Sequence, residues 1–316
     1  MNRMSDRFKG YFFTFISVLS VSSVYIFSKY LLNRVSLPQF GFWWFLAGGI
    51  FIVLYGLWTK SFAIYRTFGP RDYLILLVNG LLELSATYFF YKAIQTVPNP
   101  AIVSFMGNLS PVFIFILGTL ILKEKFNTRE IIGALITITG AFLISYKGGI
   151  RLQDMFIKGS LYILAFVTLF AINSILLKKY VRRLSPVVLT INRVIFIFGF
   201  FTVWLWLSDD SFAVPSNLWP YFVAGAFFGP FLTVISALHA LKYIEVSKKS
   251  ILGTTKGLFV MLGAYLVFGH FPTTLQIIGG ILSMIGAIMI ITARMERQKT
   301  TRWLRKNTWD KIKNNS

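Results

Sequence analysis

Long apolar stretches recur along the whole chain, and short polar connections separate them. About twenty consecutive apolar residues are enough to cross the hydrocarbon core of a bilayer as a helix. The pattern predicts ten membrane-spanning helices, near residues 10–32, 37–58, 73–94, 100–122, 131–146, 159–177, 186–207, 218–241, 250–269 and 275–292. The expected fold class is therefore all-α and integral to the membrane, with no separate soluble domain.

The second half of the chain repeats the first. Residues 104–141 align with residues 250–287 at a constant offset of 146, and ten of the 38 aligned positions are identical. Three of these pairs are glycines: Gly107 and Gly253, Gly133 and Gly279, Gly140 and Gly286. Five helices in each half reverse the direction of the second half in the membrane. We expect two inverted-topology repeats, 10–147 and 157–292, followed by a basic tail, 293–316.

Small residues form rows in the fifth and tenth predicted helices, at Gly133, Gly140, Gly279, Gly280 and Gly286. Rows of this kind let two membrane helices approach closely, so we expect them to serve packing.

Composition supports this interpretation and explains the charge. The chain is 56% hydrophobic and only 14% charged, yet its formal net charge is +21. With the N-terminus in the cytoplasm, 24 Lys and Arg residues fall on the inner side and six on the outer side, while Arg193 and Lys256 fall inside apolar stretches. This positive-inside bias predicts cytoplasmic termini in the cell (inner or plasma) membrane. Because membrane topology accounts for the positive charge, we do not expect the protein to bind nucleic acid.

The tail carries tryptophans among its basic residues, in RMERQKTTRWLRKNTWDKIKNNS. This composition is typical of an interfacial helix or a disordered segment on anionic lipid headgroups.

Motifs for catalysis and cofactors are missing from the sequence. It has no cysteine and only two histidines, with no H-E-x-x-H, G-x-S-x-G or Walker motif. We therefore expect neither a metal site nor a cofactor, and a non-enzymatic function driven by a gradient or by exchange.

Two stretches carry a family resemblance: NLSPVFIFILGTLILKEKFNTREIIGALITITGAFLI in the first half, and SPVVLTINRVIFIF at the start of the seventh helix. Over roughly residues 10–292 the chain resembles EamA-type members of the drug/metabolite transporter superfamily. Two positions depart from the pattern. His270 stands where the first repeat has Glu124, and Phe45 stands in the second helix where the seventh has Arg193.

Three charged residues lie well inside apolar stretches: Glu83, Arg193 and Lys256. A charge at the bilayer centre costs about 2.5–3.5 kcal/mol on insertion scales, so each should face a partner or a wetted cavity. Glu83 could pair with either cation, carry a coupling proton or bind a cationic substrate. Arg193 is interpreted mainly as structural.

Lys256 follows Thr254 and Thr255 on the ninth helix, and its repeat counterpart on the fourth helix is Ser110, near Asn108. The resemblance implies that these two helices line a central cavity. It also implies that a lysine there can hold an anionic group, as in phosphate-sugar and nucleotide-sugar members. An ion pair between Lys256 and Glu83 is the structural alternative.

Two further polar residues, Asn173 and His239, are candidates for the cavity wall. For His239, packing is the preferred interpretation.

These observations favour a secondary carrier of a small polar metabolite, such as an amino acid or a phosphorylated metabolite, working by alternating access as an exporter or exchanger. The excess of buried cations leans towards an organic anion or zwitterion. The alternative is proton-coupled export of cationic or aromatic amines through Glu83, which has aromatic neighbours at 88–91. An integral-membrane enzyme and a passive channel are less favoured.

Overall fold

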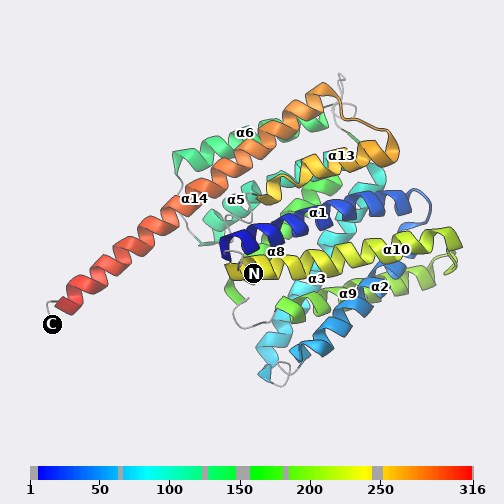
Figure 1. Ribbon diagram of the computed structural model, residues 1–316, viewed down its shortest axis with the longest axis horizontal. Coiled ribbons are helices and arrows are strands. Elements are labelled where there is room, and N and C mark those ends of the chain that lie inside the picture. The colour runs from blue at the N-terminus through cyan, green and yellow to red at the C-terminus, as the bar shows by residue number, and fades with distance from the viewer. Residues whose placement is uncertain are drawn as a thin grey trace, which may run out of the picture.

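The computed structural model describes residues 6–62, 67–122, 127–146, 157–180, 184, 186–243 and 252–314, which are built of helices (Figure 1). The first half contains α1 (Asp6–Leu32), α2 (Leu37–Trp58), α3 (Pro70–Thr96), α4 (Pro100–Met106), η2 (Gly107–Leu109), α5 (Ser110–Leu122) and α6 (Thr128–Ser145). The second half contains α8 (Ser160–Tyr180), α9 (Pro186–Leu207), η3 (Ser216–Leu218), α10 (Trp219–Ala226), η4 (Phe227–Thr233), α11 (Val234–Tyr243), α13 (Lys256–Phe268) and α14 (Thr274–Asn314).

These elements form ten rods that cross the bundle in alternating directions, as the apolar pattern predicts. Six helices are by themselves long and apolar enough to span a membrane: Phe8–Leu32, Leu37–Trp58, Pro70–Thr96, Val187–Leu207, Ser216–Ala237 and Thr274–Ala293. Three further apolar helices are shorter: Pro100–Ile114, Ser160–Leu176 and Leu252–Phe268.

Breaks interrupt the fourth and eighth rods, which the sequence pattern predicts as continuous helices. In the fourth rod, Pro111 has no N–H to donate to the carbonyl of Gly107, and the chain forms the short 3₁₀ turn η2 there. The Ser110 hydroxyl donates to that carbonyl instead, over 2.8 Å. In the eighth rod, Pro230 lies inside the π-helix η4, and the hydroxyl of Thr233 donates to the carbonyl of Phe228.

The two halves pack around an approximate twofold axis. Three contacts pair a rod with its repeat counterpart: α2 with α9, α4 of the fourth rod with α13 of the ninth, and α6 with α14. The repeat relates α1 to α8, and α3 to the rod formed by α10, η4 and α11. The contact of α3 with α8 therefore has its equivalent in the contact of that rod with α1. This arrangement confirms the inverted repeat of two five-helix halves.

The α6–α14 crossing depends on glycine (Figure 1). A Cβ atom at Gly140 would lie 2.6 Å from the carbonyl oxygen of Gly279, and a Cβ at Gly279 would lie 2.6 Å from that of Gly140. The pair Gly133 and Gly286 makes the same reciprocal contact, at 2.8 and 2.5 Å. The repeat offset of 146 relates Gly133 to Gly279 and Gly140 to Gly286, so it converts one contacting pair into the other. A twofold axis through the crossing of two antiparallel helices requires this relation.

The last helix continues beyond the bundle. Helix α14 has 41 residues, about 60 Å at 1.5 Å per residue, and its C-terminal half projects from the end where α1 begins (Figure 1). The predicted tail at 293–316 therefore continues α14 as far as Asn314. Its contact with lipid headgroups stays a prediction.

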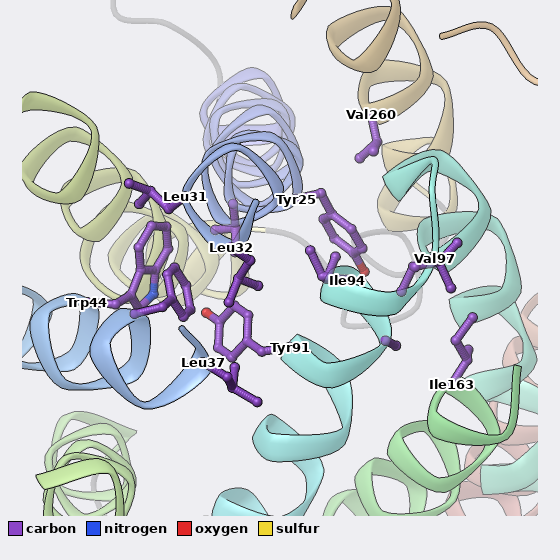
Figure 2. Close-up of a cluster of buried hydrophobic side chains, with 14 of the residues drawn as sticks. Tyr25, Leu31, Leu32, Leu37, Trp44, Tyr91, Ile94, Val97, Ile163 and Val260 are labelled. Carbon is purple, nitrogen blue, oxygen red and sulfur yellow. The ribbon is translucent and has the colours of Figure 1, made fainter. Parts of the chain in front are cut away.

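The opposite end of the bundle, where α1 and α3 end and α2 and α4 begin, is called the α1–α2 end. Buried apolar side chains close it (Figure 2). Leu31, Leu37, Ile94 and Val97 are 0–3% exposed.

We expect Gly140→Ala to destabilise the bundle, since the added methyl group would overlap the α14 backbone. Overpacking of this kind costs about 1–3 kcal/mol, measured as the free energy of unfolding in detergent. Gly199→Ala in α9 is the matched control, because an added Cβ there meets no atom within 4 Å. It should be neutral or stabilising by up to about 1 kcal/mol. Equal effects of the two substitutions would contradict the crossing.

Candidate functional site

A cavity of about 250 Å³ lies at the centre of the bundle, between the two halves. Both halves contribute to its wall, through α1, α2, α3, η2, α5, α8, α9, η4, α11 and α13. Much of the wall is aromatic: Tyr25, Trp44, Phe45, Phe90, Tyr91, Phe166 and Phe170.

The cavity is closed towards the α1–α2 end. Trp44 and Tyr91, on that side, are 0% and 3% exposed, whereas Phe170 is 41% exposed.

Three charged residues line the cavity: Glu83, Arg193 and Lys256. The carboxylate is paired with the arginine, since Arg193 Nε lies 3.3 Å from Glu83 Oε2. The guanidinium also donates to the hydroxyl of Thr87 over 3.3 Å. Of the partners that the sequence left open for Glu83, the structure selects Arg193.

A chain of amides supports the other carboxylate oxygen. Asn173 Nδ2 donates to Glu83 Oε1 over 2.7 Å, and Asn79 Nδ2 donates to Asn173 Oδ1 over 2.9 Å. Asn173 therefore lies behind Glu83 and outside the cavity lining. The network joins α3, α8 and α9 and occupies both oxygens of Glu83, the only carboxylate that the described residues place in the wall.

Lys256 lies at a helix break that repeats the break in the fourth rod. It is the first residue of α13, as its counterpart Ser110 is the first residue of α5. A Cβ atom at Gly107 would lie 3.7 Å from Lys256 Nζ and 4.0 Å from the Tyr25 hydroxyl, so both groups border the same face of η2. Among the residues that the structure describes, no carboxylate oxygen lies within 4.0 Å of Lys256 Nζ.

The wall thus contains two cations and one carboxylate. The N-termini of α5 and α13 also carry the positive ends of their helix dipoles. The arrangement can bind an anion at Lys256, while the Glu83–Arg193 pair is internally neutralised.

Besides Asn173, four predicted site residues lie outside the cavity lining. The amide of Asn108 donates to the hydroxyl of Ser283 on α14 over 3.4 Å. Thr255 Oγ1 donates to the carbonyl of Leu252, and Thr254 is 4% exposed beside the break. His239 Nδ1 lies 2.9 Å from the carbonyl oxygen of Ile235, and its ring packs on Phe13. Four predicted residues do line the cavity: Lys256, Ser110, Glu83 and Arg193.

Sequence reasoning found one part of the aromatic wall, Phe90 and Tyr91, as neighbours of Glu83, and missed the rest. Tyr25 and Trp44 stand in apolar stretches, and nothing local distinguishes them from lipid-facing rings. One signal was available, since Pro230 interrupts an apolar stretch and the π-helix around it forms part of the cavity.

A larger crevice, of about 1010 Å³, lies between α5, α6 and α8. Its wall is almost entirely apolar, and among the described residues that line it only Lys158 is charged. Exposed side chains such as Leu161 and Ile138 surround it, as expected of a lipid-facing surface. The central cavity is therefore the better candidate for a polar solute.

Comparison with known proteins supports the architecture. The sequence model of the EamA-like transporter family matches residues 8–146 and 157–292. A crystal structure of a protein with 17% sequence identity superposes with a TM-score of 0.65, over 92% of this chain and 98% of the other, which shows the fold alone.

Three curated relatives are also similar. An uncharacterized transporter of Synechocystis sp. is 25% identical over 247 residues, which cover 74% of this chain and 70% of the relative. One of Methanothermobacter thermautotrophicus is 23% identical, over 70% of this chain and 65% of the relative. The uncharacterized transporter YyaM of Bacillus subtilis is 24% identical, over 69% of this chain and 72% of the relative.

Fold and cavity together define a multi-pass membrane protein of two inverted repeats around a central polar site. The chain belongs to the EamA-like transporter family, in the drug/metabolite transporter superfamily, as the family match over both halves shows.

The Glu83–Arg193 pair makes a prediction about stability. Arg193→Met leaves Glu83 without its counter-ion, and Glu83→Gln does the same to Arg193. Each should cost about 1–3 kcal/mol of unfolding free energy, less than a fully buried pair, because the Arg193 side chain keeps 39% of its surface exposed. The double variant, with Arg193→Met and Glu83→Gln together, should lose less unfolding free energy than the sum of the two single losses. Additive losses in unfolding experiments would show that the two groups are not coupled.

Proposed function

We propose that this protein is a secondary carrier that moves a small organic anion or zwitterion by alternating access, with Lys256 binding the anionic group. One observation carries the proposal. Lys256 lines a cavity inside the membrane, and among the described residues no carboxylate lies within 4.0 Å of its ammonium group.

An uncompensated ammonium in a low-dielectric cavity is costly, and a bound carboxylate or phosphate removes that cost. A lysine suits the role as a compact charge with three donors. A cavity of about 250 Å³ admits an amino acid or a small phosphorylated metabolite and excludes much larger solutes.

The inverted repeat supplies a mechanism. In related architectures one half rocks against the other around a fixed central site, which exposes that site to each side in turn. The chain has no Walker motif, so a solute or ion gradient would drive export or exchange. The charge bias supports cytoplasmic termini in the cell membrane, with the α1–α2 end outside. We infer a carrier and not an enzyme.

The rival function is proton-coupled export of cationic or aromatic amines through Glu83. The aromatic wall favours it, because rings can hold both apolar and cationic groups. However, Asn173 and Arg193 already occupy the two oxygens of Glu83. An amine would have to displace Arg193, so the anion ranks first.

The test uses purified protein with three probes: 3-phosphoglycerate, L-phenylalanine and tyramine. We expect the phosphate or the zwitterion to raise the melting temperature of the wild type. At 100 times its Kd, a bound probe adds about 2.7 kcal/mol to the free energy of unfolding. Lys256→Met should weaken that binding about 10- to 100-fold, because it removes a charge-assisted contact inside the cavity.

Lys92→Met is the matched control, since the half-buried Lys92 donates to the side chain of Gln95 on α3 and lies outside the cavity lining. It should bind the probes like the wild type. Stabilisation by tyramine that persists in Lys256→Met and is lost in Glu83→Gln would reverse the ranking. Saturable uptake of the binding probe into sealed vesicles tests the carrier itself.

A further inference from the structure

A second lysine is buried near the closed end of the cavity. The sequence places Lys29 among the outer-side charges, but the residue is only 6% exposed. Its ammonium donates to three backbone carbonyls at the end of α3, those of Ile94, Gln95 and Val97, over 3.0, 3.0 and 2.8 Å. All three donors of the ammonium group are therefore used, and they cap two carbonyls of the last turn of α3 and that of the C-cap residue Val97.

This contact ties two walls of the cavity together. Lys29 stands one turn beyond Tyr25 on α1, and the capped turn follows Tyr91 on α3, so both elements carry cavity-lining residues. Figure 2 shows Tyr25, Tyr91, Ile94 and Val97 in the cluster that closes the α1–α2 end.

We propose that Lys29 is a positioning residue for transport: its cap on α3 holds the cavity closed at the α1–α2 end, and the cavity opens there only when the cap is released. The inference rests on the alternating access of the proposed function. It adds the contact that decides which side is closed.

The physical basis is that the cap has two satisfied states. When the end is closed, the ammonium and the carbonyls satisfy one another without water, and the cation complements the negative end of the helix dipole. When the end opens, water can hydrate both partners. In Lys29→Met the closed state buries unsatisfied carbonyls, whereas the open state loses little. The substitution must therefore favour the open state.

The absence of cysteine makes the test direct. Ala86, on α3, lines the cavity and is 5% exposed, so Ala86→Cys provides a single reporter thiol. A membrane-impermeant maleimide is added to sealed vesicles of known orientation, on the α1–α2 side. We expect Lys29→Met to be labelled about tenfold faster than the Lys29 parent, or more. Lys92→Met is the control: it removes the same charge near the same end of α3 and should leave the rate unchanged.

A purely structural role would slow or abolish folding without changing sidedness. Labelling from the opposite side is therefore measured in parallel and should not rise in Lys29→Met. If that variant does not fold, Lys29→Gln, which keeps an amide donor, should show a smaller change in the same direction. Equal labelling of folded Lys29 variants and the parent, or faster labelling from both sides, would overturn the proposal. No substrate is used, so failure here is distinguishable from failure of anion binding at Lys256.

Discussion

Polar groups inside a bilayer have to find their partners within the protein, because the hydrocarbon core offers no water. The structure meets this constraint at several buried polar groups. Lys29 takes the carbonyls at the end of α3, and Glu83 takes Arg193 and Asn173. Near each proline break, a hydroxyl donates to a backbone carbonyl: Ser110 to that of Gly107, and Thr233 to that of Phe228. Polar satisfaction is thus concentrated around the cavity and at its closed end, while the lipid-facing surfaces stay apolar.

Against this background, Lys256 is unusual because its charge faces a cavity and finds no carboxylate within 4.0 Å among the described residues. The twofold relation of the halves explains the place, since equivalent breaks in the fourth and ninth rods meet at the centre. The twofold relation does not require identical side chains at equivalent positions, and the counterpart of Lys256 is Ser110. A symmetric scaffold thereby presents one asymmetric charge, which suits a site that binds one anionic group and has to release it again.

Much of this architecture could be predicted from the sequence, because its determinants are local or periodic. Apolar length predicts the ten rods, and the register of Gly140 with Gly286 predicts the repeat on which the α6–α14 crossing depends. Lys256 and Arg193 stand out since charges are rare in apolar stretches. Lys29 was missed because a lysine three residues before a helix end is indistinguishable from one that reaches the membrane surface. Its capping role depends on the approach of Val97, which only the tertiary structure brings near.

The most direct test of the central claim is to see where an anion binds. A crystal structure with 4-bromobenzoate, located by the anomalous signal of bromine, distinguishes the two accounts of Lys256. Our account predicts the bromine in the central cavity, with the carboxylate within about 3.2 Å of Lys256 Nζ and the Glu83–Arg193 pair intact. A carboxylate bound elsewhere, or a Lys256 ammonium paired with Glu83 in place of the ligand, would contradict it.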